Sequence, residues 1–479
     1  MLTYELTAEG VPLYQQLYQA IRADITAGRL SPDTRLPSKR SLADNLGIST
    51  ITVENAYDQL ISEGWVIARP RRGYFVAAVV SRKEPKAVKA VTLPPMPGNA
   101  PPEARFNFSG GRTAAEQFPF SIWARLLREA LSHRKNELLQ PPPGSGAMEL
   151  RRAIAGHLLS FRAMAVEPEQ IIVGAGTEYL YGLLLQLLGR QQLYCLENPG
   201  YHKLEQIYEK GGACLTWAGL DEKGLSADQL RSSGAAIVHL SPNHHFPTGI
   251  TMPASRRYEL LAWASEAGDR YIIEDDYDSE FRSRGRPLPT LFSIDACDRV
   301  IYMNTFTKSL IPTIRISYMV LPAGLAARFD RELGFYSCTV SSFEQYTLAA
   351  FISRGYFEKH INRMRLHYGR KRQQILELLR HCLPEGVCHV RENDSGLHFL
   401  LELNTSLTDG EVKERLAAKG AKISAVTDFY HHDSDKAALP SKGLFLFNYA
   451  GMELEQLEKY LKVMAKILKD ADCRPPAMK

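Results

Sequence analysis

TFTKSLIPTIR, residues 305–315, follows the apolar run Val300–Met303, and that run predicts a buried strand. Lys308 is therefore expected just beyond the carboxyl end of a strand, which is where open α/β sheets bind their ligands. A lysine at such a place can form a Schiff base with a carbonyl cofactor. Side chains suited to holding a phosphate flank it: Thr305, Thr307 and Arg315. A surface lysine in a Ser/Thr-rich turn is the alternative for this segment on its own.

A second apolar run, residues 271–273, leads into the segment EDDY, residues 274–277. Acidic residues are common at strand ends, so a solvent-facing cluster is the simple alternative. Pyridoxal phosphate (PLP) needs a carboxylate that keeps its pyridine nitrogen protonated, and Asp275 would supply it. Tyr277 would donate a hydrogen bond to the ring O3′. The order Asp275-x-Tyr277, a lysine at the end of the next strand and then Arg315 resembles the fold-type I aminotransferases, and it predicts PLP as the cofactor.

The resemblance to fold type I covers about residues 105–475 and implies further cofactor contacts. Residues 171–173 form a strand-type run, and the glycine-rich turn after it opens a helix, an arrangement that cradles phosphate. To this cradle the resemblance assigns Gly176, Thr177 and Glu178. It also implies that Tyr201 stacks on the PLP ring, whereas a tyrosine of the core is the alternative. Predicted strands with helices between them indicate the large mixed sheet of fold type I, and a smaller α+β lobe is expected after about residue 360. These strands begin near residues 171, 193, 213, 236, 271, 300 and 316.

The composition is that of an ordinary globular protein of two or three domains. The chain has 479 residues, 45% hydrophobic and 23% charged, with a net charge of only +5, so any binding of nucleic acid must come from a local patch. Seven scattered cysteines without paired metal-ligand spacing fit a reducing compartment. No signal-peptide pattern and no run of membrane-spanning length is present, so we expect a cytoplasmic location and no membrane contact.

Residues 1–78 predict a winged helix-turn-helix, an α+β unit. A first helix runs from Pro12 to about Gly28, a second begins after Ser38, and a third begins after Ser49. A tight turn before the third helix suits its entry into the major groove of DNA. Two short strands follow, joined by a hairpin that carries three arginines suited to phosphates or the minor groove. This unit has eight basic and eight acidic residues, so a small helical domain that binds a protein is the alternative.

The sequence LPSKRSLADNLGIS within this unit resembles the DNA-binding domain of GntR-type bacterial repressors. The resemblance implies double-stranded operator DNA as a partner, contacted by the second helix, the start of the third helix and the wing. The residues implied are Ser38, Arg40, Ser49, Thr50, Thr52, Arg71, Arg72 and Gly73. The family usually has arginine where this chain has Thr50, so one base or phosphate contact of the family is lost and an unusual operator preference is expected.

Residues 79–104 predict a basic, proline-rich linker between the two modules, with the effector domain expected over residues 105–475. A GntR-type unit joined in this way to a fold-type I domain resembles the MocR subfamily of GntR-type regulators. The resemblance implies a PLP-dependent transcriptional regulator that senses PLP or an amino compound. It also implies a homodimer and allows a head-to-tail, domain-swapped arrangement. The alternatives are an active aminotransferase with an accessory DNA-binding domain and, with less support, a DNA-binding protein with an empty scaffold.

The predicted cofactor site is complete, whereas the substrate-binding residues of aminotransferases are not. Those enzymes hold the substrate carboxylate with an arginine of the small lobe, and this chain has no arginine between Arg415 and Arg474. Lys203 stands where similar regulators have arginine, and Phe246 stands where many aminotransferases have an asparagine that binds O3′. Positioning of a substrate can supply ~7–11 kcal/mol of a barrier. We therefore expect sensing rather than turnover, with a residual transaminase half-reaction left open and no metal required.

Overall fold

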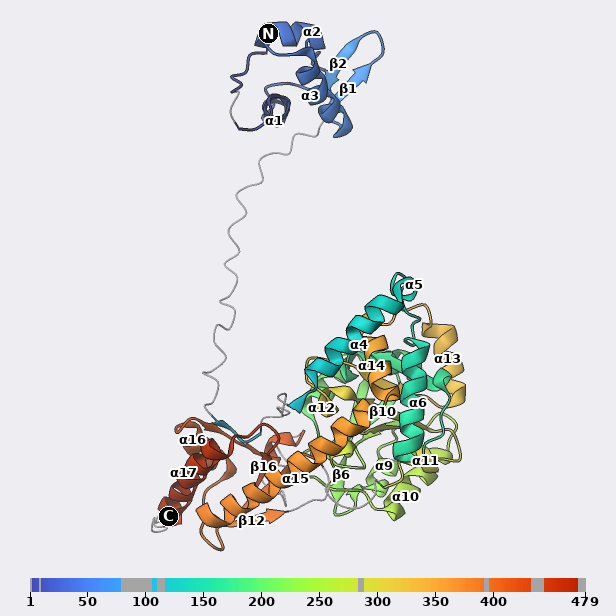
Figure 1. Ribbon diagram of the computed structural model, residues 1–479, viewed down its shortest axis with the longest axis vertical. Helices are drawn as coiled ribbons and strands as arrows, with labels where there is room; N and C mark the ends of the chain where they lie inside the picture. Colours follow the sequence, from blue (N-terminus) through green and yellow to red (C-terminus); the bar gives the residue numbers. More distant parts are fainter. Residues whose placement is uncertain are drawn as a thin grey trace. The chain divides into compact units, whose positions relative to one another are not determined.

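The computed structural model of the chain describes residues 2–7, 10–78, 106–109, 117–282, 288–391, 396–431 and 443–472 (Figure 1). Contacts divide the chain into two compact units, Met1–Ala100 and Pro101–Lys479, and each unit has a hydrophobic core of its own. The predicted linker, residues 79–104, lies outside the described residues. No helix in the described ranges is long and apolar enough to cross a membrane.

The first unit consists of three helices and a two-stranded antiparallel wing. Its elements are α1 (Leu13–Thr26), α2 (Lys39–Leu46), α3 (Thr50–Ser62), β1 (Val66–Arg69) and β2 (Gly73–Val76). One face of each long helix is apolar, and residues such as Leu17, Ile21, Val53 and Leu60 meet in a fully buried core. The predicted helices and wing are all present, with the first strand starting at Val66.

The second unit is built on a large mixed sheet, as the sequence predicts, and the sheet has eight strands where seven were expected. The strands follow the order β4 (Ile171–Gly174), β11 (Ser317–Val320), β10 (Val300–Thr305), β9 (Tyr271–Asp275), β8 (Ile237–Leu240), β5 (Leu193–Asn198), β6 (Cys214–Asp221) and β7 (Gly224–Leu225). From β10 to β6 the neighbours are parallel, so their carboxyl ends meet at one edge of the sheet. Seven of these strands correspond to the predicted apolar runs, and β7 is a two-residue addition that pairs with β6.

Helices cover both faces of the large sheet. Alternate strand residues point to opposite faces, so Ile273 packs with α7 and Ile272 packs with α10. This burial on both sides explains why the strands are nearly continuous apolar runs. The helices of the large lobe are α4 (Phe120–His133), α5 (Lys135–Leu138), α6 (Met148–Arg162), α7 (Thr177–Leu188), α8 (His202–Lys210), α9 (Ala227–Ser232), α10 (Ala254–Ser265), α11 (Leu291–Ile294), α12 (Phe306–Ser309), α13 (Ala323–Leu333) and α14 (Ser342–Ser353).

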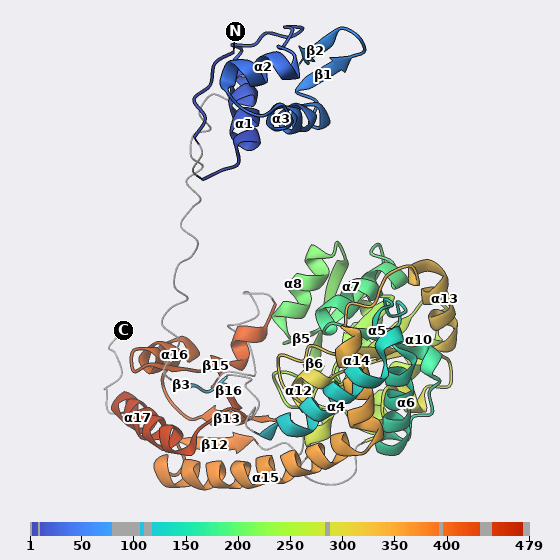
Figure 2. The same cartoon turned by 45° about the horizontal axis from the view of Figure 1, so that its top comes forward.

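A long helix, α15 (Tyr356–Cys382), runs from the large lobe to a smaller α+β lobe, where it packs against α17 (Figure 2). The small lobe has a four-stranded sheet in the order β12 (Cys388–Arg391), β13 (His398–Leu403), β16 (Leu444–Asn448) and β15 (Ser424–Ala425). Its remaining elements are α16 (Asp409–Ala417), α17 (Leu454–Asp472) and a parallel pair formed by β14 (Ala421–Lys422) and β3 (Phe106–Asn107). The predicted small lobe is therefore present, with its sheet placed beside the carboxyl edge of the large one.

Candidate functional site

A cavity of about 520 Å³ opens at the carboxyl ends of β5, β8, β9 and β10, where they face the small lobe. The structure brings the residues predicted for PLP together around it, although they come from five separate segments. Thr177, Glu178, Tyr201, Asp275, Tyr277, Thr305, Thr307, Lys308 and Arg315 all line the cavity. Gly176 lies directly behind Arg315, with the Arg315 guanidinium against its α-carbon.

Lys308 lies in α12, a single turn that follows β10. Thr305 begins this turn, since its hydroxyl accepts a hydrogen bond from the Thr307 backbone N–H at 3.2 Å and another from the Ser317 hydroxyl at 2.8 Å. The Thr307 hydroxyl is buried and has no hydrogen-bond partner among the described residues. Lys308 itself is half-buried, at the level of the cavity wall. The Lys308 amine therefore lies at a strand end, and the neighbouring residue Thr307 has a buried hydroxyl without a hydrogen-bond partner among the described residues.

The N-terminus of α7 and Arg315 form a cradle for an anion. Gly176 precedes α7 with a φ of +94°, and a Cβ at this residue would lie 2.5 Å from Arg315 Nη2, so only glycine fits. Arg315 has a φ of +47°, a conformation that residues with a side chain rarely adopt. Free backbone N–H groups and the dipole of α7 add positive potential at the same point. Thr177, Thr307 and Arg315 line the cavity together, and hydroxyl and guanidinium groups are suited to binding a phosphate.

The carboxylate of Glu178 lies beside this cradle and pairs with two cations. It forms an ion pair with Lys203, and its Oε1 lies 3.7 Å from Arg315 Nη2. The hydrogen bond from Lys203 lowers the pKa of Glu178 and raises the pKa of Lys203. The sequence predicts Glu178 as a phosphate contact because it lies at the N-terminus of a helix. The structure adds that its carboxylate competes with a phosphate for Lys203 and Arg315.

Asp275 has one satisfied oxygen and one unsatisfied oxygen. Its Oδ2 accepts a hydrogen bond from the Tyr181 hydroxyl at 2.6 Å and lies 3.5 Å from His239 Nε2. The ring of His239 is in turn held by Tyr208, whose hydroxyl lies 2.8 Å from Nδ1. Asp275 Oδ1 is buried without a hydrogen-bond partner among the described residues. Because a buried carboxylate oxygen without a donor is costly, this atom calls for a protonated ring nitrogen of the kind that PLP provides.

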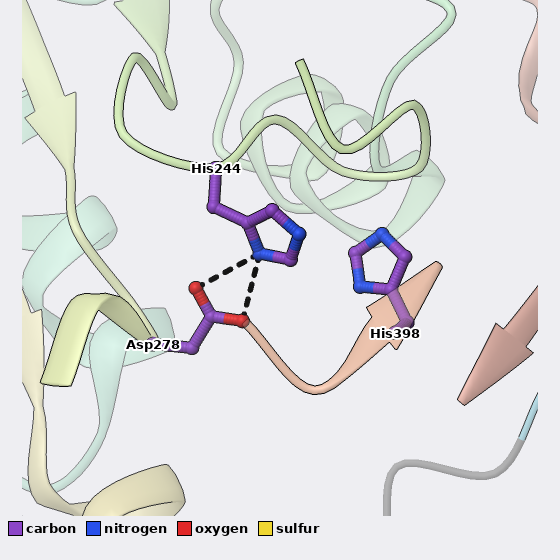
Figure 3. A group of neighbouring side chains, drawn as sticks. All are labelled: His244, Asp278 and His398. Carbon is purple, nitrogen blue, oxygen red and sulfur yellow. Dashed lines mark hydrogen bonds and ion pairs between the residues drawn. The ribbon is translucent and has the colours of Figure 1, made fainter. Parts of the chain in front are cut away.

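Tyr277 ends in a buried group of polar side chains that sequence reasoning did not find. Its hydroxyl lies 3.3 Å from His244 Nδ1, which lies 2.9 Å from Asp278 Oδ2 (Figure 3). His398 reaches the same point from β13 of the small lobe, and its ring centre lies 4.4 Å from that of His244. Potential metal-ligating atoms of His244, Asp278 and His398 lie within 4.8 Å of one another. Burial lowers the pKa of His398 well below its usual value, so its imidazole is neutral.

Aromatic side chains of both lobes form the wall of the cavity where the large lobe meets the small one. The ring of Phe246 lies edge-on to Tyr201, at 5.8 Å between ring centres, and to Phe429, at 5.1 Å. Trp217 stacks on His431 at 3.4 Å, and both line the cavity. Tyr201 is 51% exposed, so it is not the core tyrosine of the alternative interpretation.

The winged unit presents its predicted DNA contacts on the surface. Ser38 and Ser49 cap α2 and α3 by accepting hydrogen bonds from Ser41 N and Thr52 N, both at 3.1 Å. Arg40 is exposed and borders a shallow hollow at the start of α2. Among the other predicted contacts, Thr50, Arg71 and Arg72 are exposed, and Thr52 and Gly73 are half-buried.

The wing arginines differ in what they contact. Arg69 forms an ion pair with Asp33 at 2.6 Å, and its guanidinium lies over the ring of Phe75. Arg71 and Arg72 are exposed at the turn, where Arg71 and Gly73 have φ values of +61° and +106°. Arg71 and Arg72 are therefore the wing side chains placed to reach a phosphate backbone.

Comparison with known families and proteins agrees with both modules. Residues 13–76 match the bacterial regulatory proteins of the gntR family, and residues 107–464 match aminotransferase class I and II. The chain is 37% identical to the uncharacterized HTH-type transcriptional regulator YdeL of Bacillus subtilis, covering 94% of this chain and 96% of that protein.

Two further relatives are 33% identical to the chain. The probable rhizopine catabolism regulatory protein MocR of Rhizobium meliloti matches over 95% of this chain and 93% of its own length. The HTH-type pyridoxine biosynthesis transcriptional regulator PdxR of Corynebacterium glutamicum matches over 88% and 90%. Among solved structures, the kynurenine aminotransferase of Pyrococcus horikoshii, in complex with PMP, covers 77% of this chain and 92% of its own at 25% identity, with a TM-score of 0.66.

Proposed function

The chain belongs to the MocR subfamily of GntR-type transcriptional regulators, and we propose that PLP held at Lys308 sets how tightly it binds operator DNA. The observation that carries the proposal is the unsatisfied, buried Oδ1 of Asp275. It lies in the same cavity as the amine of Lys308 and the anion cradle at the N-terminus of α7. A carboxylate for the ring nitrogen, an amine for the aldehyde carbon and a cradle for the phosphate are the three requirements of PLP binding.

Each residue has a role that follows from its surroundings. The Tyr181 hydroxyl donates a hydrogen bond to one oxygen of Asp275, so the other oxygen is left for the pyridine nitrogen. Thr307 and Arg315 would bind the phosphate, and Tyr201 would cover the ring from the exposed side. When bound, PLP supplies an aldehyde carbon that condenses with a primary amine, which is the chemistry that lets the site respond to amino compounds.

Regulation rather than turnover is supported by the wall that faces the small lobe. The described lysine and arginine side chains that line the cavity are Lys203, Lys308 and Arg315, and none of them comes from the small lobe. A carboxylate of an amino acid substrate would therefore lack the cation that positions it for transamination. We infer sensing of PLP, or of an amine that combines with it. A relative named for pyridoxine biosynthesis supports PLP as the signal.

We further propose that the chain acts as a homodimer in the cytoplasm, with a head-to-tail arrangement as one option. Two winged units in a dimer would bind two half-sites of operator DNA. Arg40, Arg71 and Arg72 would contact the DNA backbone, and the first residues of α3 would approach the bases. Sedimentation of the PLP-loaded protein at micromolar concentration checks the dimer, and a monomer would contradict it.

The test of the cofactor site is chemical fixation. Purified protein should take up PLP with a visible absorbance band, and borohydride should then attach the cofactor covalently to Lys308, as mapped by peptide mass spectrometry. Lys308→Ala should lose the covalent adduct while keeping its fold. A protein that stays colourless with added PLP, or an adduct on another lysine, would refute the proposal. Steady formation of a keto acid would favour the enzyme alternative instead.

A further inference from the structure

The cavity extends beyond the cofactor cradle toward the small lobe, and this outer part has its own chemistry. Its wall is formed by the rings of Phe246 and Phe429 together with Leu397. Behind Phe246 and Phe429 lies a buried aliphatic cluster of Leu400, Val426, Leu444 and Leu446. Apolar surface of this kind favours an apolar group of a ligand by roughly 25 cal/mol per Å² buried. The shape and composition therefore suit an aliphatic or aromatic side chain.

Two carboxylates lie in the outer part of the cavity, each beside histidine side chains. Glu205 lies there between two histidines, His202 at 3.2 Å and His431, which belongs to the small lobe. The carboxylate of Asp278 forms a hydrogen bond with the ring of His244. His398, which like His431 belongs to the small lobe, lies beside the same group. Glu205 and Asp278 both line the cavity.

The lysine and arginine side chains that line the cavity lie in its other part. Lys203 and Arg315 both contact Glu178 beside the phosphate cradle. Lys308 is the amine reserved for the cofactor. A carboxylate brought into the outer part would meet no further lysine or arginine among the described residues that line the cavity.

We propose that the outer part of the cavity takes a primary amine that carries an apolar tail and no carboxylate. The inference rests on the proposed PLP site, which supplies the group with which the amine combines. Lys308 gives up its double bond to the aldehyde carbon of the cofactor, and the amine nitrogen forms a double bond to the same carbon. The two hydrogens lost by the neutral amine end on the Lys308 nitrogen, so no oxidant or reductant is needed. The tail then lies against Phe246 and Phe429.

Matched pairs of ligands test the proposal on the intact, PLP-loaded protein. The pairs are phenethylamine with phenylalanine, tyramine with tyrosine, and 3-methylbutylamine with leucine, which differ only in the carboxylate. Absorbance of the bound cofactor and anisotropy of labelled DNA give two readouts of each titration. We expect each amine to act at a concentration ~10- to 100-fold lower than its amino acid, because an unpaired charge in a buried site is costly. Equal or stronger responses to the amino acids would overturn the proposal.

A variant tests the aromatic wall separately. Phe429→Ala should raise the concentration of 3-methylbutylamine needed by ~10-fold, because the amine tail loses its main apolar contact. Tyr258→Ala, an exposed aromatic residue of α10 outside the cavity, is the matched control and should change nothing. An unchanged response of Phe429→Ala would count against the proposal, and a variant that fails to fold leaves the wild-type pairs to decide. If wild-type protein takes up no PLP, the proposed cofactor site itself is wrong.

Discussion

Replacing Glu178 with glutamine should strengthen PLP binding, although Glu178 lies at the cofactor's own cradle. Its carboxylate is 3.7 Å from Arg315 and also pairs with Lys203. The phosphate of PLP must compete with that carboxylate for the same cations. Glutamine keeps the length of the side chain and its backbone N–H and removes the charge.

The expected gain follows from the geometry of the pair. At 3.7 Å two unit charges in water interact by about 1 kcal/mol, and the water value applies because both side chains are almost half exposed. Freeing Arg315 and removing repulsion of the phosphate should together give ~1–2 kcal/mol, or roughly 5- to 30-fold in Kd. The difference should shrink in high salt, which screens exposed charges.

A titration of the apo protein with PLP, followed by absorbance, measures the effect. Lys203→Met is the matched variant, and it should weaken PLP binding because Glu178 then pairs with Arg315 alone. Thermal unfolding of each apo variant checks the fold, because the negative charge of Glu178 also stabilises the N-terminus of α7 by ~0.3–1 kcal/mol. Unchanged or weaker PLP binding by Glu178→Gln, with the fold intact, would refute the reasoning.

Three further outcomes are expected. Asp275→Asn should weaken PLP binding at least ~10-fold, because a charged hydrogen bond to the ring nitrogen is worth ~1.5–3 kcal/mol, and an unchanged PLP titration would contradict the role of Asp275. Arg72→Ala should weaken DNA binding across all sequences and lower the salt slope by about one. Arg29→Ala, an exposed arginine after α1 that pairs with Asp24, should not, and equal slopes for the two variants would argue against the wing contact. Burial raises the pKa of Glu197 to about 8. Above the ordinary pKa of a glutamate, the folded state therefore keeps a proton on Glu197 that the unfolded chain has lost. The free energy of unfolding falls accordingly as pH rises toward 8. Glu197→Gln should reduce the loss of thermal stability between pH 5 and pH 8, and an identical pH profile would show that Glu197 is not the group responsible.

The fold was predictable because its strands and helices carry strong local signals. Runs such as Val300–Met303 are apolar without alternation, since helices cover both faces of the sheet. Lys308, Asp275 and Arg315 follow such runs directly, so their common position at one edge of the sheet could be inferred from chain order alone. Ser38 and Ser49 identify the winged unit in the same way, since both stand at helix starts where a hydroxyl accepts from the backbone.

The supporting layer of the site could not be predicted. Tyr181 donates a hydrogen bond to Asp275 and His239 lies 3.5 Å from it, but these two residues lie on a helix and a strand whose sequences carry no signal other than burial. His244, Asp278 and His398 meet from two lobes and are separated by up to 154 residues of chain, a contact that no spacing rule gives (398 − 244). Glu178 shows the same limit: its place at the cradle followed from the sequence, whereas its pairing with Lys203 depends on how α7 and α8 pack.

The central claim is that PLP on Lys308 sets DNA affinity, and a direct comparison of apo and PLP-loaded protein on one DNA duplex tests it. The duplex is selected from a randomised library with each form, and affinity is measured by fluorescence anisotropy at fixed salt. The account predicts that PLP changes the Kd of the wild-type protein by at least ~10-fold, a differential of ~1.4 kcal/mol between two states. In Lys308→Ala the change should be reduced or absent. Equal affinities of the apo and PLP-loaded wild-type forms, with the cofactor verified on Lys308, would contradict the claim.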